Sequence, residues 1–388
     1  MDEDAREHVI SFKTVSILFS TLLFGIAMTI YDPVWPFIVK EANIDPSEYS
    51  YVVFTAQLLE FISRWFSSGY LMPSISFVVG SLSISFSMGV LLYSISPPAI
   101  YTSLSTLRLG RALHFLGRGQ IIGRIFKKRG LAFSVFRLSS QIGMLLGPVL
   151  GYLIYSMLSR NFIFLSGLLL GILSAVVFLP YIKEIPKTVR RGLLFWRGGV
   201  NRDVKIVTGL TFINNMARQT FIPFHFIVAP YLFNVDPGYI ALAAFLERGV
   251  SMLSSVPIGW LSDKIGDKRF ILIFSEAMLS IGILFYIYPY LGVSGFLAST
   301  FFIGLGTASY APIVSALVSE LSPESPEDAV AFLLTAISLS RLPGSIVIGP
   351  LMAILGYGGG FIFTLICLGI VGLGLFIHYL KSGSLSIK

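Results

Sequence analysis

The chain has 388 residues, of which 55% are hydrophobic and only 12% are charged, whereas soluble proteins average about 25% charged residues. This composition excludes a soluble globular protein. A formal net charge of +8 would suggest nucleic-acid binding in a soluble protein, but here the basic residues must first be assigned to sides of a membrane. The single cysteine, Cys367, excludes a disulfide framework and a cysteine-based metal site.

Apolar runs between polar or Pro/Gly breaks predict twelve membrane spans. In chain order they cover residues 13–38, 51–72, 76–96, 101–122, 130–155, 161–182, 204–232, 239–262, 270–290, 294–318, 328–354 and 358–380. The predicted fold is an all-α membrane protein with two six-helix halves, residues 1–182 and 206–388. A basic linker, residues 183–205, joins them.

Basic residues in the loops predict the orientation. Eighteen of the 28 lysines and arginines fall in loops on the side of the N-terminus, and only Lys40 and Arg160 fall in loops on the other side. Because cytoplasmic loops carry the excess of Lys and Arg, we expect both termini in the cytoplasm of a multi-pass plasma-membrane protein. The same bias explains the net positive charge without a nucleic-acid partner.

Small residues repeat in corresponding spans of the two halves. The fifth span contains GMLLGPVLG, which brings four residues to one helical face: Gly143, Gly147, Pro148 and Gly151. The eleventh span repeats this spacing 202 positions later, at Ser345, Gly349, Pro350 and Ala353. Glycine at every fourth position lets a neighbouring backbone approach closely, and proline permits a bend. Internal duplication of this kind is typical of secondary transporters.

A charged loop follows the eighth span. Residues 259–269 read GWLSDKIGDKR, with glycines that permit a tight turn. This loop resembles the signature loop of the major facilitator superfamily, and residues 110–119 (GRALHFLGRG) and 143–151 are similar to its fourth-span and fifth-span motifs. The resemblance covers essentially the whole chain and implies the major facilitator fold. The fifth-span motif further suggests the drug:proton antiporter branch.

The resemblance also implies a cytoplasmic latch, in which an acid and basic residues of this loop pair with an acid two helices later. We expect the latch at Asp263, Lys268, Arg269 and Glu320, with Gly259 and Gly266 shaping the turn and the small residues of the fifth span in packing. The first-half counterpart has Pro73 where the signature has Asp. Closure is therefore expected to depend on the second half.

Eight arginines and four acids fall inside the predicted spans, although a charge at the bilayer centre costs about 2.5–3.5 kcal/mol. They should face the bundle interior, water or each other. Carboxyls in such places can carry a proton, so the coupling candidates are Asp32, Glu60 and Glu247. A helix-end role is the alternative for Asp32, and a pair with Arg64 for Glu60.

Eleven of the remaining embedded polar groups divide into two classes. Six lie near the middles of spans and are substrate-cavity candidates: Arg111, Gln141, Asn214, Asn215, Arg218 and Arg341. Five are interpreted as structural: Arg118, Arg137, Glu276, His114 and His225. A proton relay is the alternative for the two histidines.

These patterns predict a secondary active transporter that moves a small solute by alternating access. The fifth-span motif and the embedded acids favour proton-coupled export of an amphipathic or drug-like compound. The excess of embedded arginines favours instead an organic anion, a carboxylate or an organophosphate. A non-transporting receptor or scaffold is the remote alternative.

An enzyme is not expected, because the sequence has no constellation of nucleophile, metal ligands or paired acids, and no GxxxxGK[ST] phosphate loop. We expect no cofactor and no metal. The expected partners are a small-molecule substrate, protons and the lipid bilayer, with the protein as a monomer.

Overall fold

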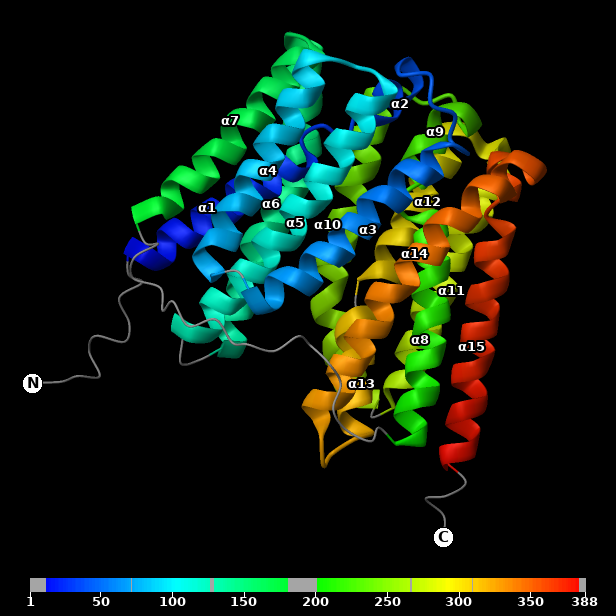
Figure 1. Cartoon of the computed structure of the whole chain (residues 1–388). Helices are drawn as coiled ribbons and strands as arrows, with labels where there is room; N and C mark the ends of the chain where they lie inside the picture. The colour runs from blue at the N-terminus through cyan, green and yellow to red at the C-terminus, as the bar shows by residue number, and fades with distance from the viewer. Residues whose placement is uncertain are drawn as a thin grey trace, which may run out of the picture. The chain divides into compact units, whose positions relative to one another are not determined.

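The computed structural model describes residues 12–70, 72–125, 129–180, 201–265, 267–308 and 310–383 (Figure 1). Within these ranges the chain is helical and forms no strand. Nine of the predicted spans correspond to one helix each: α3 (Tyr49–Tyr70), α4 (Pro73–Tyr93), α5 (Pro97–Ile125), α6 (Arg129–Met157), α7 (Arg160–Phe178), α10 (Pro237–Ile265), α11 (Lys268–Ile287), α14 (Pro326–Gly359) and α15 (Ile362–Gly383).

The other three predicted spans are broken, although the sequence analysis treated them as continuous. The first divides into α1 (Phe12–Thr29) and α2 (Trp35–Glu41), the seventh into α8 (Arg202–Phe221) and α9 (His225–Leu232), and the tenth into α12 (Gly292–Thr307) and α13 (Tyr310–Glu320). A short 3-10 helix, η3 (Pro289–Leu291), precedes α12.

Proline explains the breaks in the first and seventh spans. Pro33 stands between α1 and α2, and Pro223 between α8 and α9. Proline has no backbone N–H and its ring clashes with the preceding helical turn, so each helix ends before it. The two breaks occupy corresponding places in the two halves, and paired discontinuous helices mark binding sites in many transporters.

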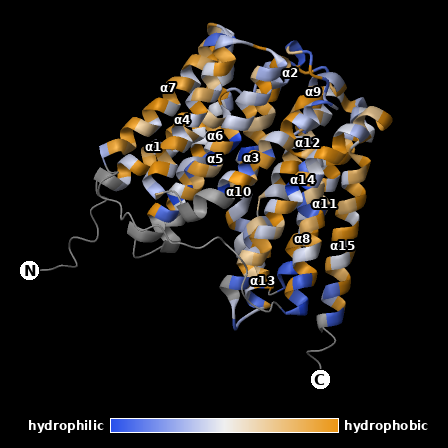
Figure 2. Ribbon diagram, viewed as in Figure 1, coloured by the Kyte–Doolittle hydropathy of each residue, from blue (hydrophilic) through white to orange (hydrophobic). Residues whose placement is uncertain are grey.

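Eight helical segments in the described ranges are long and apolar enough to cross a membrane. Figure 2 shows hydrophobic residues along α7, α11 and α15, and hydrophilic residues at the ends of α8 and α13. A polar group in hydrocarbon must be satisfied internally, and a helix satisfies its own backbone. The predicted all-α membrane fold is confirmed, and its helices are consistent with twelve spans.

The chain divides into two compact units. The first comprises residues 1–32 and 62–193, and the second comprises residues 33–61 and 194–388. Residues 33–61, which include α2 and the first half of α3, thus group with the C-terminal helices. The boundaries predicted for the two halves stay a prediction, and residues 183–200 of the predicted linker lie outside the described residues.

In the first unit, α6 packs closely on α1. A Cβ atom added at Gly143 would meet the backbone carbonyl of Leu22, and one added at Gly151 would meet that of Ile30. At Gly147 the added atom would meet the side chain of Thr29. The close helix approach predicted for this small-residue face is therefore present, and it requires glycine.

In the second unit, α8, α11, α13, α14 and α15 share an apolar core. It is built from buried aliphatic residues, among them Val207 on α8, Leu272 on α11, Val314 on α13, Leu333 on α14 and Val371 on α15. This core fixes the five helices against one another, so that polar side chains at their ends and along their faces are held at defined distances.

Candidate functional site

A central polar cluster forms in the second unit where α3, α8 and α14 meet. The guanidinium Nη1 of Arg341 donates to Oε1 of Glu60 at 3.2 Å. One turn before Glu60, the side-chain amide of Gln57 donates to that of Gln219 at 2.7 Å. We call Gln57, Glu60, Gln219 and Arg341 the central polar cluster. It unites a proton-coupling candidate with a substrate-cavity candidate 281 positions apart.

The two charged members of the cluster differ in exposure. The side chain of Glu60 is 3% exposed, whereas that of Arg341 is 26% exposed. A buried carboxylate needs a cationic partner, and Arg341 supplies it. The guanidinium has five donors, and the side chain of Arg341 is partly exposed.

A second pair links α9 to α10. Nε2 of His225 lies 2.9 Å from Oε2 of Glu247, and His225 is buried between Phe221 and Phe226. Nδ1 of the same ring lies 2.7 Å from the backbone oxygen of Ile222. His225 is the first residue of α9, so the pair stands directly after the break in the seventh span.

This geometry fixes the number of protons on the His225–Glu247 pair. A backbone carbonyl can only accept, so Nδ1 of His225 must carry a proton. The 2.9 Å contact between Nε2 and the carboxyl oxygen then needs one further proton, on either atom. Without it, two lone pairs would face each other in a buried place. A proton on one of these two atoms would make the contact a hydrogen bond.

Arg218, a predicted substrate-cavity residue, lies among buried partners. Its guanidinium pairs with Glu276 at 3.0 Å, and the two side chains are 9% and 3% exposed. Arg218 also donates to Asn214, Ser275 and the carbonyl of Gly306, each at 3.1 Å, and its guanidinium carbon lies 4.4 Å from the ring centre of Tyr310. These partners fix Arg218 as a core residue of the second unit.

Asn214, another predicted substrate-cavity residue, is fully buried and accepts a hydrogen bond from Arg218 at 3.1 Å. Asn215 is half-buried, and its amide donates to the carbonyl of Thr211 one turn earlier at 3.0 Å. The other candidates belong to the first unit, where Arg111 on α5 and Gln141 on α6 are both half-buried. Their role in solute binding stays a prediction.

Asp32 lies in the turn between α1 and α2, and its backbone N–H donates to Thr29 at 3.2 Å. His114 is buried in the first unit, stacked on Phe24 with ring centres 3.5 Å apart. Its Nδ1 lies 3.2 Å from the hydroxyl of Ser81. These contacts agree with the packing role expected for His114.

The predicted latch is only partly assembled. Nζ of Lys268 and Oε1 of Glu320 are 2.5 Å apart, so these two residues do meet. Arg269 instead pairs with Asp267 at 2.9 Å and contacts His378 at 3.0 Å. The reason is local, since Asp267 is the N-cap of α11 and accepts from the backbone N–H of Arg269 at 2.9 Å. Gly266 and the side chain of Asp263 lie outside the described residues, and Gly259 lies in the last turns of α10 with open space beside it.

The loop between α2 and α3 contacts the end of α14. Tyr357 donates to Asp45 at 2.7 Å, and the backbone N–H and hydroxyl of Ser47 donate to the same carboxylate at 2.8 and 2.6 Å. Partial burial raises the pKa of Asp45, but these hydrogen bonds lower it more, so the pKa lies below its usual 3.8. Lys40 lies 5.2 Å from the ring centre of Tyr231 nearby.

A groove of about 580 Å³ in the first unit is almost wholly apolar, and Leu82, Phe86, Tyr93 and Leu168 are among its lining residues. It holds none of the candidate residues. Hydrogen-bonding or charged groups that could orient a polar solute or carry a proton are therefore found elsewhere, in the central polar cluster and the His225–Glu247 pair.

Sequence reasoning missed Gln57 and Gln219, which complete the central polar cluster. Their signal was a polar residue within an apolar span, and Gln57 lies three residues before Glu60 on the same helical face. The contacts of His378 with Arg269 and Asp203 were also not predicted. His378 lies close to the end of the last span, where a polar residue is unremarkable until its neighbours are known.

The chain was compared with known protein families and structures. The family model described as Major Facilitator Superfamily matches residues 17–199 and 207–384. A structure of peptide transporter POT in complex with sulfate has a TM-score of 0.76 at 14% identity, over 95% of this chain and 94% of that one. A mutant of the nucleoside transporter NupG has a TM-score of 0.73 at 12% identity, over 95% and 100%. Such identities show the fold alone, and no curated protein sequence matches significantly.

Proposed function

The chain belongs to the major facilitator superfamily and is therefore a membrane transporter, and on that premise we propose that it exports a small amphipathic or drug-like solute in exchange for protons. Alternating access, in which the two halves rock about a site near the midplane, moves solute and proton in opposite directions. The proposal includes a plasma-membrane location, cytoplasmic termini and a monomeric protein, as the loop charges and composition suggest.

The observation that supports the proposal is the contact of 2.9 Å between Nε2 of His225 and Oε2 of Glu247. A hydrogen bond between these two atoms needs one proton, and the pair joins α9 to α10 immediately after the break at Pro223. Loss of the proton leaves two lone pairs facing each other and frees the start of α9. Such a change in helix contact is what couples proton release to a conformational step.

Burial strengthens this switch. His225 is buried and Glu247 is half-buried, so water screens their interaction only weakly. The energy difference between the protonated and deprotonated arrangements is therefore larger than for an exposed pair. Glu247 thereby remains the favoured proton carrier among the predicted acids, with His225 as its hydrogen-bond partner, while Glu60 is held by Arg341.

A second candidate function is proton-coupled transport of an organic anion. The observation that favours it is the 26% exposure of the Arg341 side chain. A guanidinium binds a carboxylate or phosphate through two parallel hydrogen bonds, and an anionic solute would compete with Glu60 for Arg341. The two candidates differ in the charge of the solute.

The test is transport by the purified protein in proteoliposomes, with a panel of amphipathic cations, neutral amphipaths, carboxylates and organophosphates. A proton gradient whose direction is opposite to the solute movement should drive transport of an amphipathic compound. In Glu247→Gln this gradient-driven transport should be abolished while solute exchange without a gradient continues. Glu48→Gln, which changes an exposed acid in the loop before α3, is the matched control and should behave like the parent. Gradient-driven transport at the parent rate in Glu247→Gln would refute the assignment.

A further inference from the structure

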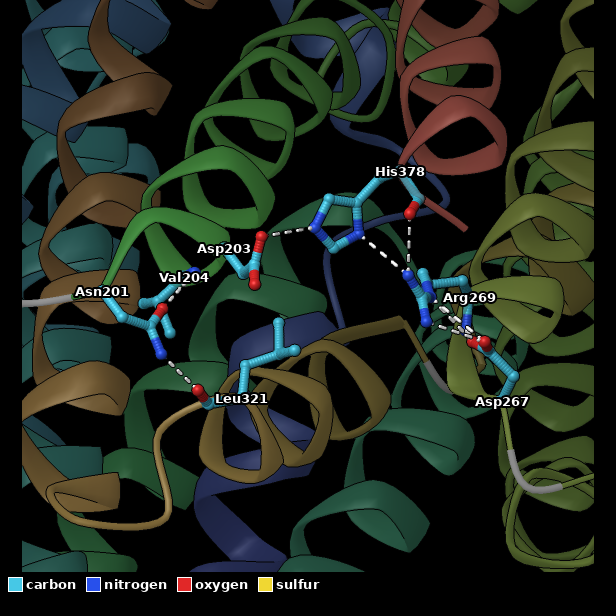
Figure 3. Close-up of polar contacts among 7 residues, drawn as sticks. All are labelled: Asn201, Asp203, Val204, Asp267, Arg269, Leu321 and His378. Atoms are coloured by element: carbon cyan, nitrogen blue, oxygen red, sulfur yellow. Dashed lines mark hydrogen bonds and ion pairs between the residues drawn. The ribbon is translucent and has the colours of Figure 1, made fainter. Parts of the chain in front are cut away.

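Four polar contacts join the ends of four helices of the second unit in a closed ring, and Figure 3 shows all of them except the contact between Lys268 and Glu320. The ring runs from α8 to α13, α11, α15 and back to α8, through these contacts: Asn201 with the carbonyl of Leu321, Glu320 with Lys268, Arg269 with His378, and His378 with Asp203. We call this set the helix-end ring. It includes the Lys268–Glu320 pair but extends well beyond the predicted latch.

Local helix chemistry positions the members of the ring. Asn201 is the N-cap of α8 and accepts from the N–H of Val204 at 2.8 Å, while Asp267 caps α11. Asp203 lies in the first turn of α8, where the helix dipole favours an acid. Each of these side chains lies at the start of a helix, where it is held beside a neighbouring helix.

His378 is the member that joins α15 to both α8 and α11. Its Nδ1 lies 3.0 Å from Nη1 of Arg269, and its Nε2 lies 3.3 Å from Oδ1 of Asp203. Arginine can only donate, so Nδ1 must accept and carries no proton. Nε2 then holds the single ring proton and donates it to Asp203. The ring as it stands requires a neutral His378.

A second proton on His378 is incompatible with this arrangement. The new N–H on Nδ1 would point at a guanidinium N–H, so that two donors and two positive charges would face each other. Nη1 of Arg269 also donates to the backbone carbonyl of His378 at 3.1 Å, so the repulsion would weaken both bonds from Arg269 to α15. The pair of Arg269 with Asp267 at 2.9 Å would remain. The attraction of His378 to Asp203 would increase, which would pull the imidazole of His378 away from α11.

We propose that the helix-end ring is a proton-operated clasp, closed while His378 is neutral and opened between α11 and α15 when His378 gains a second proton. Histidine is the residue type whose charge changes between about pH 5 and 8, and the other ionisable members are Asp, Glu, Lys and Arg. The clasp thus responds to the pH of the compartment at this end of the protein. This proposal does not rest on proton coupling at Glu247.

Within the described residues, the charged and titratable groups beside His378 include Asp203 from α8, Arg269 and Asp267 from α11, and Tyr379 and Lys381 on α15 itself. The further basic residues of the first turn of α8, Arg202 and Lys205, are exposed. Asp203 favours the second proton and Arg269 opposes it. Removing Asp203 should therefore lower the pH at which the clasp opens, and removing Arg269 should raise it.

The test is hydrogen–deuterium exchange of the full chain in nanodiscs at pH 7.5 and 5.5, corrected for the intrinsic pH dependence of amide exchange. Amides in the last turns of α15, around residues 376–381, should lose about tenfold protection at the lower pH, as expected for one lost charge-assisted hydrogen bond. Amides near the start of α15, around residues 362–370, serve as the internal control and should not change.

Variants identify the responsible group. His378→Gln keeps a donor for Asp203 but gains no charge, so its protection should be the same at both pH values, whereas His378→Lys should show low protection at both. Asp203→Asn should require a lower pH for opening than the parent. If the parent shows no loss at pH 5.5, or if His378→Gln shows the same loss as the parent, the clasp is refuted.

Discussion

Removal of the carboxylate of Glu276 should strongly destabilise the protein. In Glu276→Gln the guanidinium of Arg218 stays buried, at 9% side-chain exposure, without its counter-charge. Breaking a buried ion pair from one side costs about 3–5 kcal/mol, because the remaining charge is uncompensated. Arg218 keeps its bonds to Asn214, Ser275 and Gly306 and its contact with Tyr310, so we expect the lower end of this range.

The assay is thermal unfolding of the purified protein in detergent. A loss of about 3 kcal/mol corresponds to a fall in the unfolding midpoint of about 5 °C or somewhat less in a chain of this size. Replacing both partners, as Arg218→Met with Glu276→Gln, should recover most of the loss, because no buried charge is then left. Glu48→Gln is the control for an exposed acid.

Two results would refute this reasoning. One is an unfolding midpoint of Glu276→Gln equal to that of the parent, which would mean that Arg218 is solvated. The other is a double variant less stable than Glu276→Gln, which would mean that the charge of Arg218 has partners that compensate it fully. Either outcome would return Arg218 to the list of solute-binding candidates.

Three further outcomes are expected. Gly143→Ala should destabilise the protein by about 1–3 kcal/mol in thermal unfolding, because the added methyl group would overpack against α1. The matched change Gly209→Ala, at a position with open space beside it, should stabilise the protein by up to about 1 kcal/mol. Equal effects of the two changes would contradict the close packing. Arg341→Lys should weaken solute binding about tenfold, as expected for one lost charge-assisted bond, and unchanged binding in equilibrium assays would exclude Arg341 from the site. The pKa of Asp45 is lowered in the folded protein, so the stability from its bond with Tyr357 is present above the usual pKa of 3.8 and is lost as the pH falls further below it. The difference in unfolding free energy between the parent and Asp45→Asn should therefore shrink at acid pH. A difference independent of pH would contradict this contact.

The membrane fold was predictable because hydropathy and helix length are local properties. An apolar run of about 20 residues has few alternatives in a bilayer, and each predicted span corresponds to a helix or a broken helix. The helix breaks were less predictable. Pro33 and Pro223 were visible in the sequence, but proline is tolerated in membrane helices when neighbours satisfy the freed backbone groups, and those neighbours are distant in the chain.

The candidate site was predictable as a set of residue types but not as a set of partners. Burial cost alone indicates that Glu60 and Arg341 each need a partner, yet nothing local indicates that they meet across 281 positions. Arg218 is a second example. Its position in mid-span predicts a role in a cavity, and nothing local indicates that it pairs with the buried Glu276 on α11. Partner choice depends on tertiary packing, which hydropathy does not encode.

The most direct test of proton exchange through the His225–Glu247 pair is the internal pH of proteoliposomes, read with a trapped pH-sensitive dye while an outward or inward solute gradient is imposed. For the compound transported by the parent, we expect a proton flux opposite to the solute flux. In Glu247→Gln we expect no such proton flux under conditions where solute exchange persists. Solute movement by the parent without any change of internal pH, or the same pH change in Glu247→Gln, would contradict this expectation.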